Sequence, residues 1–187
     1  MDSSGGQPLF GGAFSAHLPP ASVDVSELRQ VPDNQEVFVH PSTDQSVIVE
    51  LLEYQAGVPD DSAARHHFED LAGSAAGSEV LSQEPLAPQL LALTGCRSAW
   101  CLTARQLVAK FNEEAQNEVR LHLALLRLPQ HHTDLLLSFN HPTHIHPLSS
   151  SATAPHASSG PSPAPWTVDD FTTLVCSLRL LDPSIFG

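Results

Sequence analysis

The sequence is short of positive charge and of long apolar runs, and both shortages restrict its partners. Among 187 residues there are 8 Lys and Arg against 21 Asp and Glu, which gives a formal net charge of −13. Nucleic acids and anionic membranes attract proteins through Lys and Arg, so neither is expected as a direct partner. No run approaches the roughly 20 apolar residues of a membrane-spanning helix, so membrane insertion is not expected either.

Cysteine is also scarce, which indicates the redox environment. The three residues Cys96, Cys101 and Cys176 are odd in number and lack paired spacing, as is typical of free thiols in a reducing compartment. The amino-terminal residues lack a basic flank followed by an apolar run, so no signal peptide is expected. We therefore expect a soluble, intracellular protein.

Common catalytic motifs are missing from the sequence. Gly11-Gly12 is not followed by the Lys and Ser/Thr of a phosphate-binding loop, and no serine lies in a Gly-x-Ser-x-Gly turn. Cys96 and Cys101 have no Cys-x-x-Cys spacing and no nearby histidine, which makes a Cys–His enzyme a minor alternative. We predict a non-enzymatic protein without catalytic residues or a cofactor.

Among the nitrogen and sulfur ligands that transition metals favour, histidine is the abundant one, with 11 residues against 3 cysteines. A weak transition-metal site is one interpretation, but structural zinc sites usually need four firm ligands that often include cysteine, so a low-complexity loop is favoured and no metal site is predicted. The histidines concerned are His131, His132, His141, His144, His146 and His156.

The most informative stretch is an acidic turn ahead of a short β-rich run. Pro32 stops any preceding helix, Asp33 and Asn34 favour a turn, and Gln35-Glu36 lead into the strand. Arg29 is the only nearby cation. A solvated turn and an exposed acidic surface for a basic partner are both open interpretations.

The charge distribution bears on this choice. Residues 1–70 hold 12 acidic and 2 basic residues, so most of the negative charge belongs to the half that contains the acidic turn. Such a field accelerates encounters with a basic protein surface, although acidity also aids solubility.

Hydrophobic patterning predicts five or six strands, a middle helix and a terminal helix. The strands are expected at 9–18, 37–40, 46–54, 99–108, 119–126 and 135–139, with a bulge near Leu126 and a loop over 74–88. One helix is expected between Pro59 and Gly73, with Ala63, Ala64, Phe68 and Leu71 on one face. The other begins after a Thr167 cap, with Phe171, Leu174, Val175 and Leu178 as its apolar stripe, and ends at Asp182-Pro183.

These elements indicate an α/β protein with a sheet covered on both faces. In several strand runs both the odd-numbered and the even-numbered residues are apolar, which is typical of strands buried on two sides. Short turns between neighbouring runs favour a mostly antiparallel sheet of five to six strands. Residues 1–8 are predicted to be a flexible tail, and the His/Ser/Pro-rich residues 140–165 a disordered insert in a single domain that spans 9–187.

Several motifs together resemble the Mog-type family of Ran guanine nucleotide release factors. The resemblance covers residues 9–139 and 165–186, and Val-Pro-Asp-x-Gln-Glu-Val at 31–37 is its most specific part. The other matching segments are Phe10-Gly11-Gly12-Ala13, Ile48-Val49-Glu50-Leu51-Leu52-Glu53, His67-Phe68-Glu69-Asp70, Ala124-Leu125-Leu126-Arg127-Leu128, Thr133-Asp134-Leu135-Leu136-Leu137 and Leu181-Asp182-Pro183-Ser184-Ile185-Phe186.

The resemblance implies an α/β/α sandwich of the PsbP-like fold, acting as a monomeric Ran-binding domain. It implies binding to the small GTPase Ran, promotion of nucleotide release and a part in nuclear transport, in the nucleus and the cytoplasm. It implies that Asp33 and Glu36 contact Ran, and we group their neighbours Arg29, Asn34 and Gln35 with them. A weaker implication is a role in surface delivery of the cardiac voltage-gated sodium channel. A trafficking adaptor that does not affect nucleotide exchange is the alternative.

Overall fold

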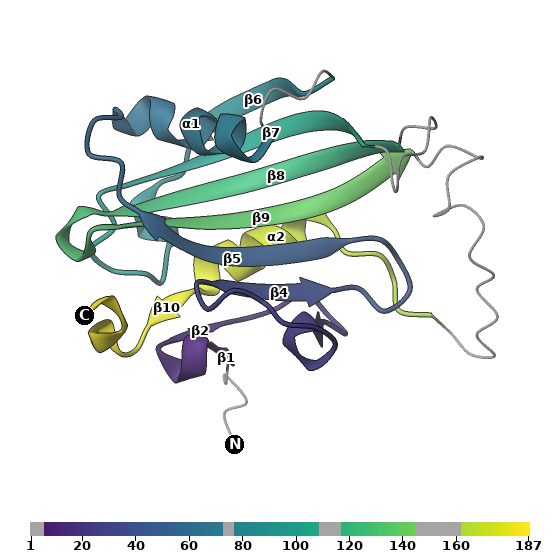
Figure 1. Ribbon diagram of the computed structural model, residues 1–187, viewed down its shortest axis with the longest axis horizontal. Coiled ribbons are helices and arrows are strands. Elements are labelled where there is room, and N and C mark those ends of the chain that lie inside the picture. Colours follow the sequence, from purple (N-terminus) through teal and green to yellow (C-terminus); the bar gives the residue numbers. More distant parts are fainter. Residues whose placement is uncertain (1–5, 73–76, 109–116, 145–161) are drawn as a thin grey trace.

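Two antiparallel sheets form the framework of the computed structural model, which describes residues 6–72, 77–108, 117–144 and 162–187 (Figure 1). The larger sheet has seven strands in the order β3-β4-β5-β9-β8-β7-β6. Its strands are β3 (Val23–Asp24), β4 (Gln35–Val39), β5 (Ser46–Glu53), β6 (Glu79–Pro85), β7 (Ser98–Val108), β8 (Asn117–Leu128) and β9 (Thr133–His144). The smaller sheet has the order β1-β2-β10 and comprises β1 (Gln7–Leu9), β2 (Phe14–Ala16) and β10 (Arg179–Leu180).

Two helices cover opposite faces of the larger sheet (Figure 1). Helix α1 (Asp60–Ala72) starts with two aspartates, which favour the positive end of the helix dipole. Helix α2 (Val168–Ser177) starts with the predicted Thr167 cap, and Thr167 and Asp170 form a complete capping box. Neither helix in the described part of the chain has the length and apolar character to span a bilayer.

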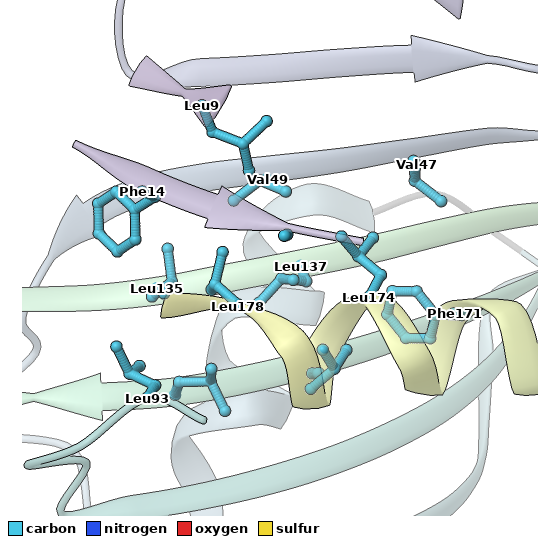
Figure 2. Close-up of a cluster of buried hydrophobic side chains, with 14 of the residues drawn as sticks. Leu9, Phe14, Val47, Val49, Leu93, Leu135, Leu137, Phe171, Leu174 and Leu178 are labelled. Carbon is cyan, nitrogen blue, oxygen red and sulfur yellow. The ribbon is translucent and has the colours of Figure 1, made fainter. Parts of the chain in front are cut away.

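The core lies in two layers, one on each side of the sheet. In β8, Leu121, Leu123 and Leu125 face α1, whereas Leu126 and Leu128 face α2. This division explains why the strand has apolar residues at successive positions, which point to opposite faces of the sheet. Figure 2 shows the α2 layer, in which the predicted stripe of Phe171, Leu174 and Leu178 packs with Leu9, Phe14, Val47, Val49, Leu135 and Leu137.

The predicted α/β/α sandwich with a mostly antiparallel sheet is confirmed, but its main sheet has seven strands instead of five or six. Two strands of this sheet were not expected: β6 lies where a loop was predicted over 74–88, and the two-residue β3 pairs with β4. The expected first strand over 9–18 is two strands separated by a 3₁₀ turn at Phe10–Gly12, where Gly11 has φ +69° and Gly12 has φ +94°. Positive φ at two successive glycines breaks the extended backbone.

Further boundaries also differ from the sequence prediction. The irregularity in β8 lies between Glu118 and Val119 rather than near Leu126. Helix α2 ends at Ser177, ahead of the expected end at Asp182-Pro183, because residues 179–180 pair with β2. Leu71 continues the helical spacing of Ala64 and Phe68, but it is 53% exposed and so is not part of the core.

The predicted insert is partly regular structure. Strand β9 runs to His144, so residues 140–144 belong to the sheet, while residues 145–161 lie outside the described part of the chain. Where the described chain resumes, the buried Trp166 is fixed by Gln45, whose side chain accepts from the Trp166 N–H at 2.7 Å and donates to its carbonyl at 2.8 Å. The start of α2 is thereby attached to the β4–β5 connection.

A buried charged network links α1 to the sheet. Arg127, 1% exposed, donates through Nε to Asp134 Oδ1 at 3.0 Å and through Nη1 to Asp60 Oδ1 at 2.9 Å. His67 on α1 contacts Asp134 Oδ2 through Nε2 at 2.9 Å. The Arg127 guanidinium also lies 4.3 Å from the Tyr54 ring centroid, a cation–π distance.

Candidate protein-binding site

A surface pocket of about 340 Å³ lies beside the acidic turn. It is formed by three segments that are far apart in sequence: the 3₁₀ turn at Phe10, the chain from Ser26 to Glu36, and the carboxy-terminal 3₁₀ turn. Its lining residues are Phe10, Gly11, Ser26, Val31, Pro32, Asp33, Gln35, Glu36 and Ile185.

Backbone and side-chain hydrogen bonds hold the acidic turn in place. Asp24 caps the short 3₁₀ turn before it by accepting from the Ser26 N–H at 2.8 Å. The Gln35 N–H donates to the Pro32 carbonyl at 3.0 Å, which closes the turn. Asn34 exchanges two hydrogen bonds with Leu51 of β5, one through its carbonyl and one through its side-chain amide. The turn is therefore fixed to β5, the third strand from that edge of the sheet.

The carboxylate of Glu36 is held in one orientation by a hydrogen bond. It lies in β4 opposite Val49, is half-buried, and accepts a 2.6 Å hydrogen bond from the Phe10 N–H through Oε1. Burial raises the pKa of Glu36, the Phe10 N–H partly opposes this rise, and the nearby charge of Asp24 adds to it. Phe10 itself has a φ of +51°, which is uncommon for a residue with a side chain.

The other predicted site residues occupy three different environments. Asp33 is exposed and lines the pocket with Glu36, and Gln35 lines it while donating to Glu50 Oε2 at 2.5 Å. Asn34 stabilises the turn but does not line the pocket. Arg29 is exposed, lies outside the lining, and forms no ion pair with either carboxylate within the described residues.

Among the lining residues that were not assigned to the site from sequence, Phe10 and Ile185 come from segments far from the acidic turn. Phe10 supplies the N–H that orients Glu36, and Ile185 supplies an apolar wall. The Phe-Gly-Gly motif and the Ile-Phe pair near the carboxy terminus are visible in the sequence, but their meeting with Glu36 depends on the small sheet, in which β1 and β10 both pair with β2.

The pocket has the chemistry of a receptor for a positively charged side chain. Two carboxylates face a cavity with apolar walls from Val31, Pro32 and Ile185, and no Lys or Arg of the described chain lines it. A cation entering it gains charge-assisted hydrogen bonds, which are stronger than neutral ones. No group of three or more potential metal ligands occurs among the described residues.

Comparison with known proteins gives consistent results. The family model described as "Ran-interacting Mog1 protein" matches residues 7–142. A Homo sapiens protein named "Ran guanine nucleotide release factor" is 56% identical over 183 residues, covering 96% of this chain and 95% of its own length. A Danio rerio protein of the same name is 52% identical over 188 residues, covering 97% and 99%.

More distant relatives match as well. A Schizosaccharomyces pombe protein named "Nuclear import protein mog1" is 34% identical over 142 residues, covering 72% of this chain and 75% of its own length. The crystal structure of the Saccharomyces cerevisiae Ran-binding protein Mog1p superposes with a TM-score of 0.66 at 23% identity, covering 97% of each chain. At that level of identity, the structural match supports the fold.

Proposed function

Because the chain belongs to the Mog1 family of Ran-interacting proteins, we propose that it binds the small GTPase Ran and promotes release of its guanine nucleotide. The family relationship and the names of the human and zebrafish relatives support this proposal. The name of the Schizosaccharomyces pombe relative supports a part in nuclear import, and hence a location in both nucleus and cytoplasm.

The pocket at Asp33 and Glu36 is the proposed Ran contact, and the orientation of Glu36 is the observation that carries it. Oε1 is held by the Phe10 N–H, so the carboxylate has a fixed direction, and Oε2 has no hydrogen-bond partner among the described residues. Asp33 adds an exposed charge at the same pocket. We group Asn34, Gln35 and Arg29 with them, as groups that fix or border the acidic turn.

Nucleotide release follows from binding if the factor prefers Ran without nucleotide. The coupling between two ligands of one protein is reciprocal, so a factor that binds the empty state more tightly weakens nucleotide affinity by the same ratio. Asp33 and Glu36 then act by attracting basic groups of Ran that otherwise stabilise the nucleotide-bound state. No covalent chemistry by this chain is required.

The test uses isosteric charge removal with purified Ran. Asp33→Asn and Glu36→Gln are each expected to weaken Ran binding by about 1–3 kcal/mol if the pocket is central to the interface, which is roughly 5–150-fold. Titration calorimetry measures the affinity, and loss of a fluorescent guanine nucleotide from Ran measures release. The matched control is Glu84→Gln, because Glu84 is an exposed carboxylate on β6, at the opposite edge of the main sheet.

The double variant Asp33→Asn/Glu36→Gln tests whether the pocket is the Ran contact. A folded double variant that still binds Ran like the wild type excludes this pocket as the contact. Ran binding without any effect on nucleotide release supports the adaptor alternative instead. We also propose that residues 9–187 act as one monomeric domain, which analytical ultracentrifugation of the free protein tests.

A role in surface delivery of the cardiac voltage-gated sodium channel is a separate proposal that rests on the family resemblance alone. It predicts a higher surface current when the wild-type chain is co-expressed with the channel. If the role depends on Ran, the double variant loses this effect, whereas an adaptor that works independently of Ran retains it. A wild-type chain without effect on the current contradicts the proposal.

A further inference from the structure

A second cavity lies on the opposite face of the sheet from the Asp33/Glu36 pocket. It has a volume of about 350 Å³ and lies between β5 and α1. Leu52 of β5 and Leu71 of α1 provide apolar surface, and Glu50, Glu53 and Asp70 provide carboxylates. We refer to it as the α1 groove.

Within the described chain, Leu52 packs against the core layer beneath α1, whereas Leu71 lies largely outside that layer. Leu71 is 53% exposed, although it follows the helical spacing of the buried residues Ala64 and Phe68. Leu52 is half-buried. A single exposed leucine is ordinary on a protein surface, but one that lies beside a cavity and a second leucine offers apolar surface to a partner.

The charged rim indicates which kind of partner fits. Glu53 and Asp70 are exposed, and the described residues place no Lys or Arg in the lining of the groove. His67, at the base, is buried and already engaged with Asp134 at 2.9 Å, so the base belongs to the network that fixes α1 to the sheet. The groove is thus a small apolar surface with the exposed negative charges of Glu53 and Asp70 beside it.

We propose that the α1 groove binds a segment of a second protein in which Lys or Arg side chains flank a leucine-type anchor. The anchor packs on Leu71 and Leu52, and the cations meet Glu53 and Asp70. Both kinds of contact are needed, because surface charge pairs alone contribute little to affinity.

The groove and the Ran pocket can be occupied at the same time. Glu36 is paired with Val49, which packs in the α2 layer, whereas the neighbouring Glu50 lines the groove on the α1 side, since successive side chains of a strand point to opposite faces. A partner in the groove therefore approaches from the other side of the sheet. The inference goes beyond Ran binding and predicts a ternary complex.

A synthetic peptide of the predicted chemistry tests the groove. The probe is a fluorescein-labelled peptide, Gly-Lys-Lys-Leu-Leu-Lys-Lys-Gly, followed by fluorescence anisotropy against the full chain. Leu71→Ser is expected to weaken binding about tenfold, which corresponds to about 1.4 kcal/mol. Asp70→Asn is expected to weaken it about fivefold. Leu90→Ser and Glu84→Gln are matched controls, because both residues are exposed and lie outside the groove.

Each outcome supports or overturns the proposal. Saturable binding that is weakened by the groove variants, changed less than twofold by the controls, and retained with saturating Ran supports it. Equal weakening by the controls indicates general attraction to an acidic protein and overturns it, as does the absence of saturable binding. Displacement of the peptide by Ran overturns the claim of a separate site. Failure of the Ran pocket variants to affect Ran binding leaves this result unchanged, so the two proposals are tested separately.

Discussion

Replacing Asp134 by asparagine is expected to destabilise the whole fold. Both carboxylate oxygens are used: Oδ1 accepts from Arg127, and Oδ2 contacts His67 and accepts from the Gln55 N–H at 3.3 Å. The Asp134→Asn side chain presents an amide N–H₂ group to one of these donors and removes the charge that faces Arg127. Arg127 is 1% exposed, so its guanidinium cannot regain water without opening the structure.

The size of the effect follows from the burial of the pair. Breaking a buried ion pair by removing one partner costs about 3–5 kcal/mol. For a protein of 150–250 residues, each kcal/mol lowers Tm by about 2–4 °C, so a decrease of roughly 6–20 °C is expected. Urea unfolding and thermal scans monitored by circular dichroism measure both quantities at pH 7. Asp61→Asn, in the exposed first turn of α1, is the control and is expected to change stability by less than about 1 kcal/mol.

The pH dependence gives a second arm to this test. Burial acts to raise the pKa of Asp134, but hydrogen bonds from His67 and Arg127 and the charge of Arg127 outweigh it, so the pKa is lowered overall. A lowered native pKa means that the stabilisation is present above the unfolded value of about 4 and is lost as the pH falls through the native value. The difference between wild type and Asp134→Asn is therefore expected to shrink below about pH 4. A loss below about 1 kcal/mol at pH 7, or a difference that does not change with pH, would refute the assigned role of the pair.

Three further changes probe other parts of the structure. Glu36→Gln should leave the free energy of unfolding at pH 7 unchanged or higher, because burial raises the pKa of Glu36 and so disfavours its ionised form. Urea midpoints of the wild type and the variant should converge below about pH 4, where Glu36 is protonated. Clear destabilisation by Glu36→Gln at pH 7 contradicts this interpretation. Thr167→Ala removes the cap of α2 and should cost about 1 kcal/mol in urea unfolding, whereas an unchanged midpoint means that the cap is dispensable. Gln45→Ala removes both hydrogen bonds to the Trp166 backbone, so amide exchange at Trp166 should accelerate; equal protection in the variant disproves the anchoring role.

The elements with strong local signals could be predicted from sequence. The β8–β9 hairpin follows from two leucine-rich runs around a Pro129 turn, and the start of α2 follows from the capping box at Thr167. The exposure of Leu71 could not be predicted, because the apolar spacing along α1 extends beyond the end of the core beneath it.

Strand β6 shows why weaker elements could not be predicted. Residues 79–85 carry little apolar periodicity, and most of them are exposed on the outer edge of the sheet. Their extended form depends on pairing with β7, which supplies hydrogen bonds that no local pattern reveals. Tertiary contacts often override propensity in such edge strands.

Part of the pocket lining could be predicted, whereas the binding role of those residues stays a prediction. The sequence around the turn indicated five site residues. Asp33, Gln35 and Glu36 line the pocket, whereas Arg29 and Asn34 lie outside its lining. The hydrogen bond from Phe10 to Glu36 spans 26 residues, and the wall at Ile185 comes from the opposite end of the described chain. Neither contact has a local signature, so the sequence could identify the charged groups but could not show the pocket.

Because the pocket is formed by three separate segments, it is expected to be lost early when denaturant is added. Ile185 is tied to the body through the short β10–β2 pairing and through the hydrogen bonds of Leu181 and Asp182 to the Ala13 carbonyl. Short peripheral segments of this kind open more readily than a sheet centre, without unfolding the remainder of a domain. Ran capture should therefore fail at milder denaturant than the loss of β-sheet circular dichroism, so partner binding reports on the intactness of the chain ends more sensitively than spectroscopy does.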